Sequence, residues 1–308
     1  MTTLLDMIDE VSINLSGYTL QQDRATHITN DVPATVSTIA APITLSLAST
    51  DSVGKGIVEI DEELFWVDNY DRVGNTATIA PYGRAYLGTT LAAHTAGTKV
   101  TIAPTFPRFV IKRAINDTIR AIGSSIFAAN TTTITSNLST SAFRLPATGN
   151  SLNIRSILAV AYQAIGPSKE WIPIRNWRFD GNANSTAFTS EQTISIYDMI
   201  TSGRTIQVVY STDPVPFTAN TETFTTQTGL PESCKDLVVL GATYRLLSNL
   251  DPARASMVSP QADETDSKRP YGSSQSLTRQ VYALFTQRLS EEIKNQQDKY
   301  PIRVHYSL

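Results

Sequence analysis

The chain has 308 residues, of which 41% are hydrophobic and 17% are charged, and its formal net charge is −3 at pH 7. This length allows one large domain or two to three small ones. The charge argues against a protein that holds nucleic acid through a dominant basic surface. Thr, Ser and Asn take the place of the charged residues, which favours strands and turns over a purely helical protein.

The sequence carries a single cysteine, Cys234, which excludes an internal disulfide framework and fits a reducing compartment. The amino-terminal sequence MTTLLDMIDE is acidic and lacks an apolar leader, so we expect no signal peptide. No stretch reaches the roughly 18 consecutive apolar residues of a membrane span, so we expect no membrane partner. The chain is therefore expected to be soluble and intracellular.

The amino-terminal part of the chain predicts one helix followed by a small group of strands. Leu4, Ile8, Val11 and Leu15 are spaced as one face of a helix, which predicts a helix over residues 3–17. The segment that follows, up to residue 50, has no helical period and is expected to be extended or loop. Apolar runs between Gly, Asn and acidic turns then predict strands at 56–60, 64–70, 76–81 and 99–102.

A second helix is predicted over residues 107–127. Pro107 suits the first position of a helix, and Gly123 could end the helix early. The residues that share its apolar face are Ile111, Ile115, Ile119, Ile122 and Ile126. The chain then returns to β character, and its clearest strands are predicted at 154–162, 192–196 and 205–210.

The carboxyl-terminal part predicts two more helices and an extended tail. Pro231 and Glu232 suit the first turn of a helix over 231–250. A further apolar stripe predicts a helix over 275–297, and the polar loop before it, 259–274, is expected to be mobile. Pro301 ends the helical pattern, and the residues after it alternate between apolar and polar, as in a strand.

None of the four helices can bury its apolar face alone, so we predict that they pack together. The predicted fold class is α+β, with a four-helix bundle core assembled from discontinuous segments and two inserted β-domains. The predicted boundaries are 1–17, 106–129 and 231–298 for the bundle, 50–105 for a small inserted β-module, 130–230 for a larger β-domain and 299–308 for an extended C-terminal arm.

The sequence carries no recognisable catalytic or metal-binding constellation. His27, His94 and His305 lie far apart and lack second ligands at metal-binding spacing. Cys234 falls in the first turn of a predicted helix, where a thiolate is stabilised, but no motif pairs it with a base. Phosphate-loop and nucleophile-elbow motifs are also missing. We therefore predict no catalytic residues, no metal site, no cofactor and no enzymatic activity.

The acidic residues around the first predicted hairpin allow two interpretations. Asp61, Glu62, Glu63 and Asp68 could bind a cation or act as paired carboxylates. They straddle a predicted turn, however, where acidic side chains are commonly solvated. We favour the solvated turn.

Two further groups of side chains also have a functional and a structural interpretation. Arg108, Lys112, Arg113 and Arg120 form a basic helix face that could touch nucleic acid, but a solvated face, or one that pairs with acids of a neighbouring subunit, is favoured. The aromatic side chains of the larger β-domain could form a sugar-stacking platform, although core packing is favoured for them: Trp171, Trp177 and Phe179.

Three stretches carry a resemblance to a known family. They are G-x-V-E-I-D-x-E-L-F-W-V from Gly56, Y-G-R-A-Y-L-G-T-T-x-A-A-H-x-A-G-T-x-V from Tyr82, and P-x-F-P-R-x-x-I-x-x-A-I-N-D-T-I-R from Pro104. Together they resemble the head-to-tail adaptor, or connector, proteins of tailed bacteriophages. The resemblance covers residues 57–120, and nothing familiar occurs between 130 and 230.

This resemblance implies a structural protein of the virion neck, made in the host cytoplasm. Its protomers would form a homo-oligomeric ring, usually a dodecamer, beneath the portal protein. The ring would extend the channel through which double-stranded DNA passes non-specifically, and would dock a downstream neck or tail protein. The alternative is a tail-fibre or baseplate protein whose β-domain binds a receptor or glycan. A hydrolase that uses the acidic cluster is a third possibility.

Two sets of residues are predicted to serve assembly in an adaptor. The first is a portal-docking arm, because its alternating side chains suit strand addition to a partner's sheet; it comprises Tyr300, Ile302, Arg303, Val304, His305 and Tyr306. The second is the basic helix face, which would contact a neighbouring subunit or line the channel.

Overall fold

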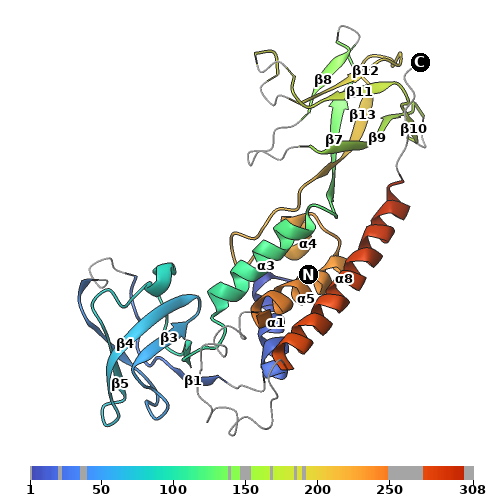
Figure 1. Cartoon of the computed structure of the whole chain (residues 1–308). Coiled ribbons are helices and arrows are strands. Elements are labelled where there is room, and N and C mark those ends of the chain that lie inside the picture. The colour runs from blue at the N-terminus through green and yellow to red at the C-terminus, as the bar shows by residue number, and fades with distance from the viewer. Residues whose placement is uncertain are drawn as a thin grey trace. The chain divides into compact units, whose positions relative to one another are not determined.

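The computed structural model describes residues 2–19, 23–34, 40–137, 140–145, 154–166, 169–183, 186–188, 192–248 and 273–301. The chain divides into two compact units. We call Leu5–Ile115 with Gly241–Arg279 the barrel unit, and Met1–Leu4, Asn116–Leu240 and Gln280–Leu308 the sandwich unit. Both contain antiparallel sheets (Figure 1).

The four predicted helices are confirmed as elements. They are α1 Leu4–Thr19, α3 Arg108–Ile122, α5 Lys235–Ser248 and α8 Ser273–Lys299, with a short α4 at Phe224–Thr228 and single 3₁₀ turns η1 at Tyr86–Gly88 and η2 at Glu232–Cys234. The apolar stripe of α1, from Leu4 to Leu15, is buried as its spacing predicts. α3 ends at Ile122, and Gly123 follows it. Within the described residues, each helix is too short or too polar to cross a membrane.

The barrel unit contains one closed sheet with the strand order β1-β6-β3-β4-β5-β2. The strands are β1 Arg24–His27, β2 Ile43–Ser46, β3 Gly56–Ile60, β4 Glu63–Asp71, β5 Thr76–Ile79 and β6 Lys99–Ile102. The two outer strands meet just past their ends, because Ile28 bridges Leu47 and the Thr29 N–H donates to the Ser46 carbonyl at 2.8 Å. Closure into a barrel removes the open edges that would otherwise invite pairing with other chains.

Alternation along the barrel strands decides which side chains fill the interior. Val58 and Ile60 on β3, and Phe65 and Val67 on β4, belong to one buried cluster. This alternation confirms the four strands predicted between residues 56 and 102. β1 and β2 come from the segment that we expected to be extended or loop, and each is only four residues long.

The sandwich unit contains two smaller sheets. The first has the order β10-β9-β13-β7, from Trp171–Pro173, Ser156–Gln163, Thr205–Thr212 and Ala128–Thr135. The second has the order β11-β12-β8, from Trp177–Asp180, Thr193–Ile196 and Ala142–Arg144. Ile194 of β12 and Val208 of β13 belong to one buried cluster, so the two sheets share a core. Trp177 and Phe179 pack against it, as favoured, whereas Trp171 is 41% exposed on an edge strand.

The prediction of a four-helix bundle core is wrong. The chain is mixed α/β, with three antiparallel sheets in its described residues. The boundary between the two units falls within α1, α3, α5 and α8, so these helices do not form a unit of their own. The physical reason is that helical spacing reports that one face is apolar, but does not report which surface covers that face.

Candidate functional site

A buried ion cluster ties the loop between β5 and β6 to the start of β4. The Arg84 Nε and Nη2 donate to the two carboxylate oxygens of Glu63 at 3.0 and 2.9 Å. His94 Nε2 lies 3.0 Å from Glu63 Oε2, and His94 Nδ1 lies 2.8 Å from Asp61 Oδ2. The side chains of Arg84, Glu63 and His94 are completely buried. These four residues form the buried ion cluster.

The charges within the buried ion cluster compensate one another. Burial alone would raise the pKa of Glu63, but hydrogen bonds from His94 and Arg84 outweigh burial and hold that pKa at about 2. Burial alone would lower the pKa of His94, yet its bonds to Asp61 and Glu63 raise it above its usual value. Both ring nitrogens face carboxylate oxygens, which accept hydrogen bonds, so this geometry favours the doubly protonated form of His94. The cluster therefore pairs two cations with two anions.

The same carboxylate fixes the backbone of the loop. Glu63 accepts hydrogen bonds from the N–H groups of Ala85 and Ala92, both at 3.0 Å. Arg84 in turn donates to the carbonyl of Ala92 at 2.7 Å. Gly83 is required beside it, because a Cβ there would lie 2.8 Å from the Ala80 carbonyl oxygen. These contacts give Gly83, Arg84 and His94 a structural role in the stretch that carried the family resemblance.

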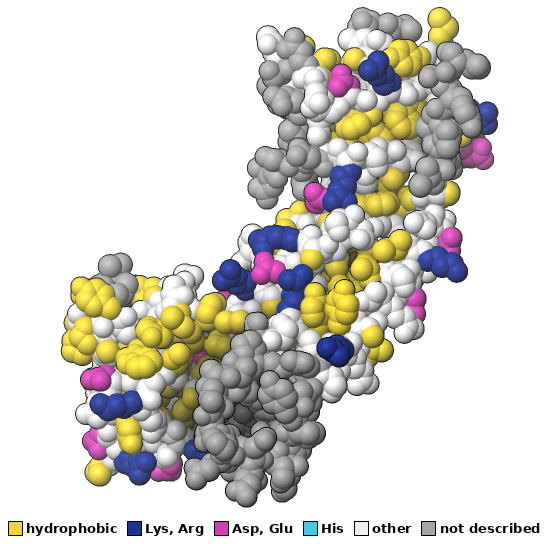
Figure 2. Space-filling model, viewed as in Figure 1, with side chains coloured by type: hydrophobic (Ala, Val, Ile, Leu, Met, Phe, Trp, Pro, Cys, Tyr) yellow, Lys and Arg dark blue, Asp and Glu magenta, His cyan; other side chains and the backbone are white. Residues whose placement is uncertain are grey.

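The loop presents large apolar side chains on a strained backbone. Tyr82, Ala85 and Leu87 have backbone φ angles of 58°, 49° and 55°. Residues other than glycine rarely adopt such positive values. Tyr82 is 71% exposed and Leu87 is 64% exposed. Tyr86 packs its ring 5.3 Å from that of Trp66. Figure 2 shows hydrophobic side chains gathered over the visible face of the barrel unit. Strain held in place by a buried cluster is typical of a binding loop.

The predicted basic helix face is largely neutralised within the chain. Arg108 Nη2 lies 2.9 Å from Asp9 Oδ1, and Lys112 Nζ lies 3.2 Å from Glu62 Oε2. Arg120 Nη1 lies 2.9 Å from the carboxylate one turn before it, that of Asp117, and Arg113 also has an interaction partner. The acids that pair with this face therefore include residues of the same chain, whereas we had favoured a solvated face or one that pairs with acids of a neighbouring subunit.

A buried carboxylate caps the first turn of α3. The Arg108 N–H donates to Glu59 Oε1 at 2.5 Å, and Glu59 is 3% exposed. Burial raises the pKa of Glu59 to about 7, although the hydrogen bond and charge of Arg108 oppose the rise. The nearby carboxylates of Asp23 and Glu62 raise it further. This side chain therefore titrates close to neutral pH.

The prediction of a solvated acidic turn holds for two of its four acids, because the side chains of Asp61 and Asp68 are 62% and 64% exposed. Asp68 is exposed and pairs loosely with Lys55 at 3.8 Å, but Glu63 is buried and Glu62 is partly covered. The partners of Glu63 and Glu62 are Arg84 and Lys112, which lie 21 and 50 residues along the chain, so a local pattern could not reveal them. No group of three or more His, Cys, Asp or Glu suited to a metal ion occurs in the described part of the chain.

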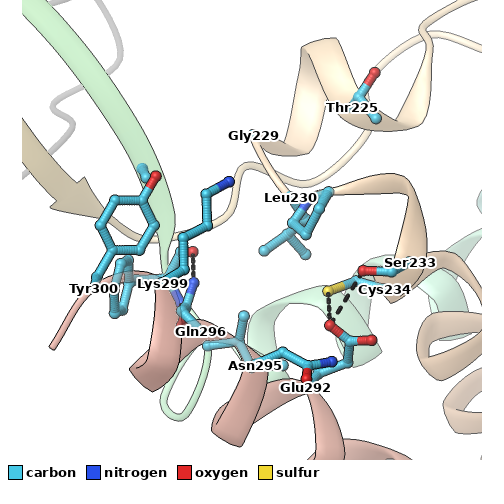
Figure 3. Close-up of a pocket in the computed structure, with 14 residues that line it drawn as sticks. Thr225, Gly229, Leu230, Ser233, Cys234, Glu292, Asn295, Gln296, Lys299 and Tyr300 are labelled. Carbon is cyan, nitrogen blue, oxygen red and sulfur yellow. Dashed lines mark hydrogen bonds between the residues drawn. The ribbon is translucent and has the colours of Figure 1, made fainter.

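The sandwich unit contains a pocket of about 500 Å³ between η2 and the last turns of α8 (Figure 3). Glu292 lies buried at its base, where the hydroxyl of Ser233 donates to Oε2 at 3.1 Å and the Cys234 thiol lies 3.7 Å from the same oxygen. Arg288 Nη2 lies 2.7 Å from Oε1 without hydrogen-bond geometry, so that contact is an ion pair. Lys299 and Tyr300 line the opposite side.

Cys234 is expected to resist alkylation in the folded chain. Burial, together with the adjacent Glu292 carboxylate, raises the pKa of the thiol to about 12. The thiolate fraction at pH 8 is then on the order of one in ten thousand. Intact mass after iodoacetamide treatment should show no adduct in native buffer and one adduct in urea. Rapid native alkylation would contradict this assignment and revive the nucleophile interpretation.

The predicted arm residues lie mostly outside the described residues. Tyr300 is described, and its ring lies 5.9 Å from that of Phe127. Ile302, Arg303, Val304, His305 and Tyr306 are not described. Sequence reasoning missed the bonds between Gln296 and the Phe127 backbone, which span 169 positions, and no short-range pattern could have found them.

A family model described as SU10 adaptor protein matches residues 84–305. The match begins at Arg84 of the buried ion cluster, covers more than half of the chain and includes the whole β-sandwich. No curated protein matches the chain.

Proposed function

Because this chain belongs to the SU10 adaptor protein family, we propose that it assembles as a closed ring beneath the portal, extends the DNA channel and docks the next neck or tail component. The chain is a structural adaptor of a bacteriophage virion that acts with other head and tail components. The observation that carries the proposal is the family match, which runs from the β5–β6 loop into the predicted arm.

The charges of the chain support a channel through which DNA passes without being held. The net charge is −3, and cations on α3 are paired with carboxylates, Arg108 with Asp9 and Lys112 with Glu62. Paired cations release few counterions when they meet phosphate, so they contribute little to DNA affinity.

The isolated protein is therefore expected to bind double-stranded DNA only weakly and without sequence preference. Fluorescence anisotropy with two unrelated duplexes at physiological salt should give equal dissociation constants of about 10⁻⁵ M or weaker. Sub-micromolar, sequence-dependent binding would contradict this expectation. It would also make the α3 face a nucleic-acid site.

Residues 300–308 are proposed to be the arm that docks onto the portal. Its alternation of Ile302, Val304 and Tyr306 with Arg303 and His305 suits addition to a sheet edge of a partner. The six strands of the barrel form a closed sheet over the described residues, so the barrel offers this arm little of an edge.

A truncation that ends at Lys299 tests the arm. If the arm docks onto the portal, the truncated chain keeps the Tm of the full chain and loses at least tenfold in portal affinity. Tyr300→Ala within the full chain is the comparison variant, because it removes the ring contact between Tyr300 and Phe127 and keeps the other arm residues, 301–308. A truncated chain with a clearly lower Tm would indicate that the arm packs on its own chain, and normal portal binding would end the proposal.

The ring itself is tested by mass measurement and negative-stain microscopy of the full chain, alone and mixed with the portal. A closed ring on the portal supports the proposal. A trimer would favour a tail-fibre or baseplate protein, and a monomer that degrades polysaccharide would favour a hydrolase. The mixture with the portal is needed because a chain that assembles only on the portal would be monomeric when measured alone.

A further inference from the structure

Among the described residues, β7 has one long edge of the four-stranded sheet without a neighbouring strand. Its eight residues pair with β13, from Ala128 opposite Thr212 to Thr135 opposite Thr205, and with no other described strand. The other edge of this sheet is β10, which is three residues long. An edge strand of this length presents a row of backbone donors and acceptors to any chain that can lie beside it.

The ladder fixes which residues of β7 face the open edge. The Ile174 N–H donates to the Val160 carbonyl at 2.8 Å. The backbone N–H and C=O groups of Val160 therefore point away from β13, and those of its two neighbours on β9 point toward β13. By the register, the backbone groups of Gln207 and Val209 on β13 point toward β9. Those of the alternate residues, Ile206, Val208 and Tyr210, point toward β7. The residues that direct N–H and C=O groups toward the open edge are therefore Ala129, Thr131, Thr133 and Thr135.

Gln296 satisfies the edge at its start, as a neighbouring strand would. Its Nε2 donates to the Phe127 carbonyl at 2.6 Å, and the Phe127 N–H donates to its Oε1 at 3.1 Å. Phe127 belongs to the same alternate set as Ala129. Beyond this amide, no described residue forms a hydrogen bond to the outward backbone groups of Ala129, Thr131, Thr133 or Thr135.

The edge also lacks the devices that keep edge strands from pairing. The β7 sequence, AANTTTIT, contains no proline and no charged residue, and its ladder with β13 has no bulge. Moreover, the pocket lies at the start of this edge, because Phe127 and Ala129 line it together with Leu230 and Lys299. A strand that extends along β7 as far as Ala129 would place a side chain there.

We propose that β7 receives an extended, uncharged segment of a different virion protein as a fifth strand, with one side chain of that segment in the pocket. Only a polypeptide offers backbone groups at the spacing of a strand, and a neutral edge favours neutral side chains opposite it. Pairing of two β7 strands would give a two-fold dimer, which a ring of one chain cannot use between successive subunits. This inference rests on the proposed virion role.

Hydrogen exchange of the full chain, isolated and within purified virions, tests the proposal. Exchange of the outward N–H groups in the fragment 128–135 should be at least tenfold slower in virions than in the isolated chain. The fragment 56–60 is the control, because β3 is paired on both sides and its exchange should not change. Equal exchange of 128–135 in both samples, or protection and a two-fold dimer in the isolated chain, would overturn the inference. A chain missing from virions would overturn the proposed function instead.

A pair of variants at one position tests the backbone contact itself. Thr133→Pro removes one outward N–H and no bond of the β13 ladder, whereas Thr133→Val keeps that N–H. Both variants should keep the Tm of the natural chain, and only the proline variant should reduce completed, tailed particles, by about tenfold. If the proline variant gives as many tailed particles as the natural chain, and the fragment 128–135 is equally protected from exchange in them, strand addition is refuted.

Discussion

Replacement of Glu63 by glutamine is expected to lower the free energy of unfolding of the barrel unit by about 3–5 kcal/mol. The substitution leaves the buried Arg84 guanidinium and the His94 cation without the carboxylate that lies between them. Glutamine also provides only one acceptor oxygen, so the Ala85 and Ala92 N–H groups cannot both keep their bonds. A buried charge that loses its partner destabilises far more than a broken surface pair.

Asp68→Asn is the matched control, because Asp68 is a solvent-exposed acid of the same hairpin. Its loss should change the free energy of unfolding by less than about 1 kcal/mol. Urea denaturation of both variants, followed by tryptophan fluorescence, makes the comparison. Similar shifts for Glu63→Gln and Asp68→Asn would mean that the buried ion cluster does not stabilise the loop.

Glu59→Gln is expected to stabilise the chain at pH 8 by up to about 3 kcal/mol. The folded pKa of Glu59 is about 7, above its ordinary value of 4.5. The folded state therefore binds more protons than the unfolded state between these two values, and the natural chain loses stability as pH rises from 4.5 to 7. Glutamine keeps the acceptor for the Arg108 N–H but has no proton to lose.

The pH dependence distinguishes this effect from a general change in packing. The difference in free energy of unfolding between Glu59→Gln and the natural chain should be close to zero at pH 4.5 and constant above pH 8. The subtraction removes the contribution of His94, whose raised pKa acts in both proteins. A difference that does not vary with pH would show that Glu59 is not titrating near neutrality.

Local patterns predicted the helices and most strands because their signals lie within a few turns or pleats. The apolar residues from Leu4 to Leu15 and from Ile111 to Ile122 recur with a helical period, because one face of each helix is buried. The predicted bounds of the strands 56–60 and 99–102 were also correct, because turn residues flank both strands. By contrast, RATH and ITLS are four-residue strands whose pattern is too short to detect, so closure of the barrel could not be foreseen.

Pairings between distant residues limited the prediction of the site. Glu63 looks like a turn acid until Arg84 and His94, which lie far along the chain, fold onto it. The same holds for the apolar faces of the helices, whose spacing suggested a bundle although the sheets supply two of the buried cores. The motif residues were recognised by resemblance, and the structure supplies their physical reason: Gly83 fits a close approach and Arg84 neutralises a buried carboxylate.

Cryo-electron microscopy of the intact virion neck tests the central claim most directly. The proposed function predicts density for this chain as a closed ring in contact with the portal, with the DNA channel continuing through it. The strand-addition proposal further predicts a fifth strand beside β7 in that density. Density for this chain on a fibre or baseplate, away from the portal, would contradict the account.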